Sequence, residues 1–312
     1  MTRAARMHAW DADPVVDDVS EPVAVDGESL VEIAAAAVAH IDLTVASGTF
    51  AMRPSLPYVP GTEGAGRIVR SGRFAPGTPV RVRGAGLGLR RDGTWTELAA
   101  VPDEALAVVP DDVDMTLAAA FFSPCVTAHA ALHQVGSLQA GERVAVTGAA
   151  GAVGAMAVQM AVAAGAAEVI GIEPTEERAA LVPGCARGVA GADGVEDVDL
   201  LVDMAGGAGL AGLVTGAVRP GGRAVLVGYA AGTQATFDLP ALLAADVRLL
   251  PMNLIRWTPR LGEIGGELLR RVAAGELTLP LTVLALEDAA EALARVREGT
   301  ARGRVALTMG GG

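Results

Sequence analysis

The residues that could do chemistry in this chain begin with a glycine-rich turn, Gly148 to Gly154, directly after the apolar run Arg143–Thr147. Gly151 and Gly154 fill two of the three glycine positions of the G-x-G-x-x-G pattern, and Ala149 fills the first. Backbone amides of such a turn, at the N-terminus of the next helix, can bind a pyrophosphate. The sequence therefore predicts dinucleotide contacts from Gly148, Ala150, Gly151, Ala152, Val153 and Gly154.

An acidic residue follows this turn at the distance typical of a ribose contact. Residues 155–164 are mostly good helix formers, and the apolar run Glu168–Ile172 after them is typical of a second strand. That strand ends on Glu173, about 20 residues beyond the turn, where a carboxylate can accept hydrogen bonds from a ribose. The order strand, turn, helix, strand and acid favours a dinucleotide-binding βαβ unit over a turn that only packs a helix on a sheet.

The elements around this unit are of two kinds. Residues 1–116 predict a β-rich domain, because short apolar runs alternate with Pro and Gly clusters. From 117 to 255 strand and helix signals alternate, as in a doubly wound parallel sheet, and residues 256–312 are predicted to return to the first domain. We therefore predict an α/β fold with domains at 1–116, 117–255 and 256–312. The runs predicted as strands in the first domain are Leu30–Ile33, Gly66–Arg70, Thr78–Val82 and Thr94–Val101.

Composition excludes several classes of function. The chain has 312 residues, 51% of them hydrophobic, which is enough for two domains with cores of their own. Its net charge of −12 argues against nucleic acid, and the absence of Lys excludes Schiff-base chemistry on a lysine. Two cysteines, Cys125 and Cys185, are too few for a disulfide framework, and no signal-peptide core or long apolar span is evident. We expect a cytoplasmic protein whose partner is a small-molecule substrate, with neither membrane nor nucleic acid involved.

Six segments in a fixed order extend over nearly the whole chain: VEIAAAAVAHIDLTVASG, PYVPGTEGAGRIVRSG, GTWTELAAVPDEALAVVPDDV, GAAGAVG, GGRAVLVG and GRVALTM. Together they resemble the medium-chain dehydrogenase/reductase superfamily, in its zinc-free quinone oxidoreductase and enoyl reductase branch. The resemblance implies a GroES-like β-barrel joined to a Rossmann domain, with NAD(P)H in the cleft between them. It also implies hydride transfer to a quinone or an α,β-unsaturated carbonyl compound.

The zinc enzymes of this superfamily bind a catalytic metal through three ligands, and this sequence departs from them at all three positions. Those positions hold Ala39, Thr62 and Ser123, none of which is a Cys, His or carboxylate ligand. Cys125 and His129 form an i,i+4 pair, but two ligands do not complete a site. We therefore expect no metal. Reduction of a conjugated C=C bond needs none, because the substrate oxygen delocalises the incoming negative charge.

The resemblance also implies roles for residues near the reacting atoms. Phe50 occupies a position where the branch often has a Tyr, so a proton must come from another group or from water. His40 is the first candidate donor, with a cofactor contact or a structural role left open. Asp42 is the second candidate, although it more often satisfies backbone groups, and Thr127 is expected to pack on the nicotinamide. Further predicted contacts are Gly228 and Asn253 for the cofactor and Phe50, Trp95, Phe122 and Trp257 for the substrate pocket.

The choice between NAD(H) and NADP(H) depends on conflicting signals after the second strand. Thr175 and Arg178 match in kind the pair that holds a 2′-phosphate in NADP-using relatives. Glu173 would oppose that phosphate at short range. Because desolvating a carboxylate beside a phosphate costs more than a flexible surface Arg gains, the balance favours NAD(H), and both cofactors stay open.

Two other functions stay open, and one assembly is expected. The segment LHQVGSLQAGERVAVTGAAGAVG is also similar to the enoyl reductase modules of polyketide synthases. The missing zinc ligands and the missing Tyr leave room for a nucleotide-binding protein without turnover. We also expect a homodimer, because the run Asp246–Leu250 predicts a long apolar edge strand that a soluble protein normally covers or pairs.

Overall fold

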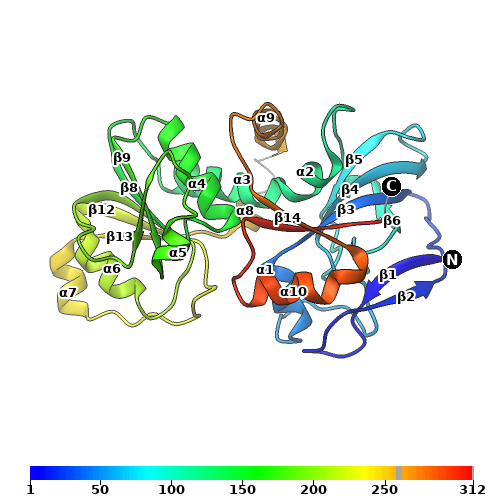
Figure 1. Ribbon diagram of the computed structural model, residues 1–312, viewed down its shortest axis with the longest axis horizontal. Coiled ribbons are helices and arrows are strands. Elements are labelled where there is room, and N and C mark those ends of the chain that lie inside the picture. The colour runs from blue at the N-terminus through cyan, green and yellow to red at the C-terminus, as the bar shows by residue number, and fades with distance from the viewer. Residues whose placement is uncertain (258–261, 311–312) are drawn as a thin grey trace. The chain divides into compact units, whose positions relative to one another are not determined.

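The computed structural model describes residues 1–257 and 262–310 (Figure 1). The chain divides into two compact units, the first comprising Met1–Phe121 with Pro280–Gly312 and the second comprising Phe122–Leu279. The first unit is rich in strands, and the second alternates strands and helices. The α/β fold class predicted from the sequence, a β-rich domain with a doubly wound parallel sheet, is confirmed.

The first unit is built on one large, mostly antiparallel sheet. Its strands follow the order β14-β15-β3-β4-β5-β7, with β6 paired to β3, and a separate two-stranded sheet pairs β1 with β2. The helix α2 packs on β3 and β4, and α10 packs on β15. The elements are β1 (Thr2–Arg6), β2 (Val15–Val19), β3 (Glu28–Val38), α1 (His40–Ala46), β4 (Glu63–Arg70), β5 (Pro79–Arg83), β6 (Leu98–Pro102), β7 (Leu106–Val108), α2 (Met115–Ala120), β14 (Leu281–Ala285), α10 (Ala289–Arg297) and β15 (Arg304–Thr308).

Alternation along β5 separates the core of this sheet from a charged face. Val80 and Val82 are fully buried in an apolar cluster, whereas Arg81 and Arg83 point to the opposite face, as the two-residue period of a strand requires. In the neighbouring strand Glu63 is the register partner of Arg83. The period of β5 therefore places two arginines beside a buried carboxylate.

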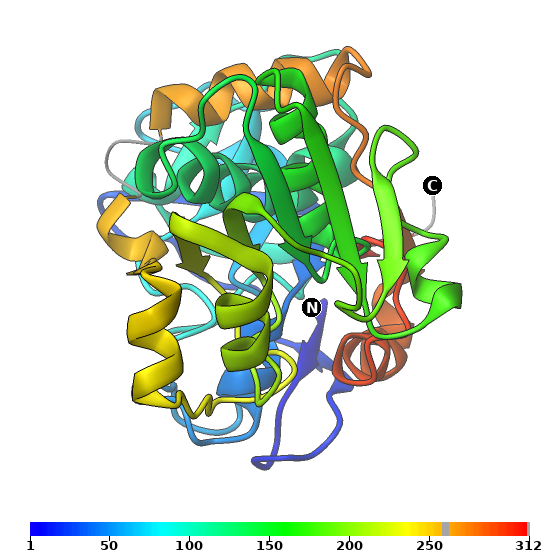
Figure 2. The ribbon, with the colours of Figure 1, turned by 90° about the vertical axis from the view of Figure 1, so that its left-hand side faces the viewer.

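The second unit is a doubly wound parallel sheet. Its six strands follow the order β10-β9-β8-β11-β12-β13, which, counted along the chain, is the 3-2-1-4-5-6 order of dinucleotide-binding folds. In Figure 2, α6 and α7, in yellow-green and yellow, lie side by side next to β12. The elements are α3 (Phe122–His129), the π-helix η2 (Ala130–Val135), β8 (Arg143–Thr147), α4 (Ala152–Ala163), β9 (Glu168–Glu173), α5 (Glu176–Ala179), β10 (Arg187–Ala190), β11 (Val198–Asp203), α6 (Leu210–Ala217), β12 (Val218–Leu226), α7 (Leu239–Ala245), β13 (Arg248–Pro251), α8 (Leu254–Trp257) and α9 (Gly262–Ala273).

The segment before Pro280 packs with the second unit, whereas the sequence assigned 256–312 as a whole to the first domain. Helix α9 contacts α3, and Gly265 makes this possible because a Cβ there would lie 2.6 Å from Cε2 of Phe122. Beyond the helix, the side chain of Gln159 donates to the carbonyl of Thr278 at 2.9 Å and accepts from its amide at 2.8 Å. These contacts tie residues 262–279 to α3 and α4. The boundaries between the compact units along the chain therefore fall at 121/122 and 279/280, whereas the sequence predicted 116/117 and 255/256.

One short helix of the first unit had no signal in the sequence. Residues 1–116 lack a sustained helical period, yet His40–Ala46 forms α1, where the side chain of Asp42 accepts a hydrogen bond from the amide of Ala39. This self-capping stabilises a helix too short to show periodicity. Within the described part of the chain, no helix is long and apolar enough to cross a bilayer.

Candidate functional site

The turn after β8 favours glycine at Gly148 and requires it at Gly154. Gly148 has a φ of +61°, and the amide of Gly151 donates to the carbonyl of Gly148 at 3.0 Å. A Cβ on Gly154 would overlap that same carbonyl oxygen and would lie 2.7 Å from the Cα of Ala149. The first turn of α4 therefore lies directly against the loop, the close approach that the last glycine of the dinucleotide pattern provides.

The alanine at the first fingerprint position is compensated from the neighbouring strand. Ala149 is fully buried, and a Cβ added to Gly171 of β9 would lie 2.7 Å from the Cβ of Ala149. Because Gly171 has no side chain, the methyl group of Ala149 fits beneath the turn. The departure from G-x-G-x-x-G thus leaves the turn intact.

The start of α4 presents backbone donors that have no partner within the helix. Gly151 is the N-cap residue, and the first amide to close an intrahelical bond is that of Ala155, which donates to the carbonyl of Gly151 at 2.9 Å. The amides of residues 152–154 precede that bond, and the helix dipole adds positive potential at this end. The predicted contacts Ala152, Val153 and Gly154 therefore lie where a pyrophosphate would fit.

Glu173 lies directly beneath this turn. Its side chain is 2% exposed, Oε1 accepts from the amide of Ala150 at 2.6 Å, and Oε2 accepts from Nε of Arg178 at 2.9 Å. Thr175 caps α5 by accepting from the amide of Arg178 at 3.3 Å. The structure thus links all three predicted residues through Arg178, which pairs with Glu173 through its side chain and with Thr175 through its amide, and the sequence did not predict this ion pair.

Sequence reasoning missed a second polar pair at the same edge of the sheet. Thr147 ends β8, Asp203 ends β11, and the two are register partners, with the Thr147 hydroxyl donating to Oδ1 of Asp203 at 2.6 Å. The main chain of Asp203 in turn accepts from the amide of the predicted cofactor residue Gly228 at 3.2 Å. The sequence did contain a signal for this pair, because an acidic residue, Asp203, ends the strand that follows the βαβ unit.

In the first unit, Asp42 is a buried carboxyl with one oxygen unused. Its Oδ2 accepts from the amide of Ala39 at 2.8 Å, and Oδ1 has no hydrogen-bond partner among the described residues. Burial raises the pKa of Asp42 to about 7, although the positive charge of Arg304 and nearby amides act in the opposite direction. Asp42 can therefore hold or release a proton near neutral pH.

His40 precedes Asp42 in α1 and differs from it in exposure. It remains exposed, yet the protein atoms packed around its ring, and secondarily the charge of Arg304, lower its pKa from the usual 6.5. The imidazole is therefore neutral over more of the physiological range than a free one. Because a neutral ring has one donor and one acceptor nitrogen, His40 can donate or accept a hydrogen bond.

Arg304, which influences both groups, belongs to an ion-pair network that sequence reasoning did not identify. Glu63 is 2% exposed, accepting from Nη2 of Arg304 at 2.8 Å through Oε2 and from Nε of Arg83 at 2.7 Å through Oε1. Two arginines on one buried carboxylate make the local charge positive. The charge of Arg304 favours deprotonation of Asp42, against the opposing charge of Glu63, and disfavours protonation of His40.

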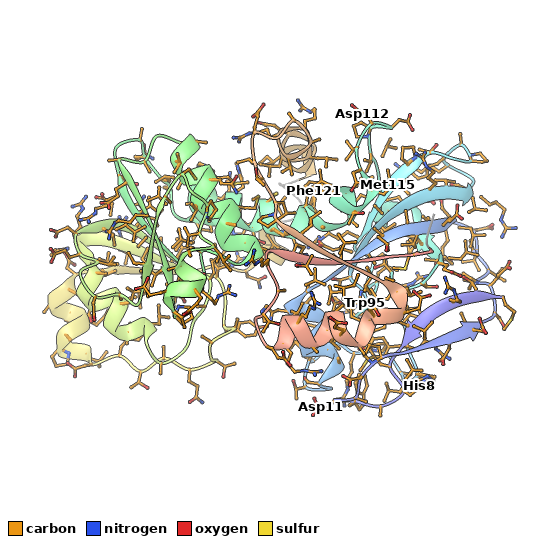
Figure 3. The ribbon with its side chains drawn as sticks, in the orientation of Figure 1. His8, Asp11, Trp95, Asp112, Met115 and Phe121 are labelled. Atoms are coloured by element: carbon orange, nitrogen blue, oxygen red, sulfur yellow. The ribbon has the colours of Figure 1, made fainter. Side chains whose placement is uncertain are left out.

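The predicted pocket residues are placed differently from one another. Trp95 is fully buried, and its indole N–H donates to the carbonyl of Ala37 at 3.0 Å, so the structure places it in the core instead of a pocket wall (Figure 3). Phe50 is half-buried beside the same core cluster. In the second unit, Phe122 is 4% exposed at the start of α3, and Trp257 is half-buried at the end of α8.

Thr127 and Asn253, predicted to lie near the nicotinamide, both belong to the second unit. Thr127 lies in α3 and is 8% exposed, whereas Asn253 follows β13 and is exposed. Any contact of Thr127 with a ligand must therefore be made by the small exposed part of this residue. Their contact with a nicotinamide remains a prediction.

The three positions that hold the metal in zinc relatives do not fit a zinc ion here. Ala39 is 8% exposed and contributes its backbone to the Asp42 contact, while Thr62 and Ser123 offer only hydroxyl groups. In the parts of the chain that the structure describes, no group of three or more His, Cys, Asp or Glu side chains could hold a metal ion. No step of the chemistry is therefore derived through zinc.

Comparison with known proteins places this geometry in a family. Residues 25–111 match the alcohol dehydrogenase GroES-like domain, and residues 164–307 match the zinc-binding dehydrogenase family model. A quinone oxidoreductase from Pongo abelii is 32% identical over 184 residues, which cover 57% of this chain and 54% of that protein. The match thus spans about half the length of that relative.

Longer but weaker similarities cover nearly the whole chain. An alcohol dehydrogenase from Geobacillus stearothermophilus is 27% identical over 94% of this chain and 95% of its own. A mycobacterial protein solved in complex with NADPH superimposes with a TM-score of 0.85 at 25% identity, over 99% of this chain and all of that one. With the two domain matches, the 3-2-1-4-5-6 sheet and the glycine turn, the chain belongs to the medium-chain dehydrogenase/reductase superfamily, in its quinone oxidoreductase-like branch.

Proposed function

We propose that this protein is a zinc-independent reductase that transfers a hydride from NAD(P)H to a quinone or an α,β-unsaturated carbonyl compound. The observation that carries the proposal is the turn at Gly148–Gly154, which approaches α4 too closely for any side chain at Gly154 and leaves the helix amides available to a pyrophosphate. Ala39, Thr62 and Ser123 support a metal-free reaction, because none can serve as a zinc ligand of the usual type.

When bound, the reduced nicotinamide supplies a hydride from C4. In a conjugated carbonyl substrate the hydride adds to the β-carbon, and the two electrons of the C=C bond move toward the carbonyl oxygen, so that a proton must then be added. Asp42 and His40 are the proposed sources of that proton. Asp42 is the better reservoir near neutral pH, because burial raises its pKa to about 7 whereas the pKa of His40 is lowered.

The remaining predicted residues have binding roles in this proposal. The turn residues bind the pyrophosphate, Thr127 packs on the nicotinamide, and Gly228 and Asn253 contact the cofactor. The substrate wall is proposed to include Phe50, Phe122 and Trp257, without Trp95. Aromatic side chains make up only 3% of the chain, so each one that reaches the substrate strongly affects the fit.

We propose that NAD(H) is favoured over NADP(H). Glu173 is held beneath the turn by Ala150 and Arg178, which keeps a carboxylate at the end of β9 where a ribose would bind. Its negative charge opposes a 2′-phosphate, and its pairing with Arg178 leaves that guanidinium less available to bind one. The Arg178 and Thr175 side chains support weaker use of NADP(H) as well.

The proposal is tested by the oxidation of NADH and NADPH with quinones, enones and enoyl thioesters, beside a binding titration of each nucleotide. Turnover of quinones or simple enones supports the proposal. Turnover confined to enoyl thioesters would instead favour an enoyl reductase of a polyketide pathway. Tight nucleotide binding with no turnover on the whole panel would favour a binding protein and contradict the proposed activity.

We also propose a homodimer formed through the outer strand of the parallel sheet. Strand β13 ends the order of that sheet, and the adjacent helix α7 leaves Leu239 and Leu243 exposed at 66% and 79%. Pairing two β13 strands would satisfy their edge hydrogen bonds and cover this apolar surface. Light scattering at micromolar concentration tests it, with a dimer expected for the natural chain and a monomer as the contrary result.

A further inference from the structure

Asp203 and Thr147 connect two loops at the carboxyl edge of the parallel sheet. Asp203 is 2% exposed, and its carboxylate accepts from the Thr147 hydroxyl at 2.6 Å and from the amide of Gly206 at 3.0 and 3.2 Å. The Thr147 oxygen accepts in turn from the amide of Met204 at 2.9 Å. The residue before the dinucleotide turn is thereby hydrogen-bonded to the loop that follows β11.

The loop after β11 also contacts the loop after β12. The amide of Ala231 donates to the carbonyl of Ala205 at 2.8 Å. A Cβ on Gly228 would overlap the carbonyl of Met204, and Gly206 adopts a φ of +68° that glycine accepts without strain. Three consecutive strand ends thus form one interlocked edge, and the Thr147–Asp203 bond is its side-chain link.

The environment of Asp203 differs from that of other buried acids in the same unit. Every hydrogen bond that the structure gives to its carboxylate comes from a hydroxyl or a backbone amide. By contrast, the buried Glu173 pairs with Arg178, and the partly buried Asp199 at the opposite end of the same strand pairs with Arg219. Burying a carboxylate without a cation is costly, so its retention at this one edge calls for a functional reason.

The position of the pair supplies that reason. The order of the sheet reverses at β8, where β9 lies on one side and β11 on the other, and ligands of such sheets bind at this switch point beyond the carboxyl ends of the strands. Thr147 is the last residue of β8 and Asp203 is the last residue of β11, so the pair lies at this switch point. We infer that Thr147 and Asp203 form a positioning pair that holds the loops at 148–154 and 204–207 in the arrangement that binds the dinucleotide.

This inference rests on the proposed nucleotide binding and adds two residues to it. Neither needs to touch the cofactor. Their effect is expected in dinucleotide affinity more than in the rate of the chemical step, because a loop fixed before binding loses less conformational entropy on binding. If the pair had only a structural role, its loss would lower stability without lowering dinucleotide affinity more than the rate of the chemical step.

The test compares Thr147→Val, which keeps the side-chain shape and removes the hydroxyl, with Thr147→Ser, which keeps the hydroxyl. The Kd for NADH and NADPH is measured by nucleotide fluorescence, and amide exchange of residues 148–154 and 204–207 is followed in the nucleotide-free protein. Thr147→Val and Asp203→Asn are each expected to raise Kd and KM about tenfold, with kcat changed less than about twofold, and to speed exchange in both loops. Thr147→Ser should behave like the natural chain.

Two further variants separate positioning from general stability. The double variant Thr147→Val/Asp203→Asn should bind dinucleotide no more weakly than the single variant with the higher Kd, because both changes break the same hydrogen bond. Asp199→Asn is the matched control, expected to lower thermal stability while leaving Kd unchanged. If the natural chain binds dinucleotide and Thr147→Val binds equally well, the inference is overturned while the proposed function survives. If the natural chain binds neither NADH nor NADPH, both fail.

Discussion

The buried Asp42 of the first unit and the buried carboxylates at the dinucleotide turn of the second unit differ in how their oxygens are used, and Glu63, also in the first unit, has both oxygens bonded to arginines. In the second unit, Glu173 lies beneath the dinucleotide turn and Asp203 lies beside it. Both oxygens of each carboxylate are hydrogen-bonded. In the first unit, Asp42 uses one oxygen for the amide of Ala39, and the other has no partner among the described residues. A fully bonded carboxylate fixes its neighbours in place, whereas a half-bonded one can accept a proton at little cost. We therefore propose that the second unit positions the nucleotide and that the first exchanges the proton.

The largest effect is expected at the turn that the second-unit carboxylates support. Gly154→Ala places a methyl group into the carbonyl of Gly148, which must displace either the turn or the start of α4. We expect nucleotide affinity to fall more than tenfold and unfolding to become easier by about 1–3 kcal/mol. Titration and thermal unfolding measure the two effects. Gly212→Ala in α6, where an added Cβ meets nothing within 4 Å, is the control and should leave affinity unchanged.

A smaller effect is expected where a bonded carboxylate also selects the nucleotide. Glu173→Ser removes the charge that opposes a 2′-phosphate and removes the carboxylate that pairs with Nε of Arg178. Because a hydrogen bond to a charged group contributes about 1.5–3 kcal/mol, the ratio of kcat/KM for NADPH to that for NADH should rise about 10- to 100-fold. Glu176→Gln, on the exposed start of α5, should leave the ratio alone. A natural preference for NADPH that Glu173→Ser does not alter would mean that this carboxylate plays no part in selection.

The half-bonded carboxylate of the first unit predicts a dependence of stability on pH. The folded protein raises the pKa of Asp42 from 3.8 to about 7, so it binds this proton more tightly than the unfolded chain does. Its contribution to stability is therefore full below about pH 4, is lost as pH rises to about 7, and changes little above that. The slope contributed by this group is at most about 1.4 kcal/mol per pH unit.

Asp42→Asn isolates that contribution, because Asn keeps an oxygen for the amide of Ala39 and cannot ionise. Denaturant unfolding between pH 4 and 8 should show the natural chain losing stability relative to Asp42→Asn as pH rises. Parallel curves for the two proteins would mean that Asp42 does not titrate in this range, and proton exchange would then have to be assigned elsewhere. His8→Asn, at an exposed position of the same unit, is the control substitution.

The fold was largely predictable from the sequence because its signals are local. The strand predicted at Arg143–Thr147 is confirmed with the same bounds, and the glycine turn and the strand ending on Glu173 follow as expected. The ion pair of Glu173 with Arg178 could not be predicted, since it depends on where α5 begins. Asp203 was missed for a similar reason, because its partners come from a strand 56 positions away and from its own loop. Trp95 was assigned to the pocket because an isolated aromatic carries no periodicity that separates core from surface.

The central claim is reduction of a conjugated acceptor by NAD(P)H without zinc. The most direct test is the initial rate of NADH and NADPH oxidation, with a quinone or enone as acceptor, before and after exhaustive chelation and with the metal content of each sample determined. We predict an unchanged rate in protein that contains less than about 0.1 zinc per chain, because Ala39, Thr62 and Ser123 cannot ligate the ion. A rate that chelation abolishes and stoichiometric zinc restores would contradict the account.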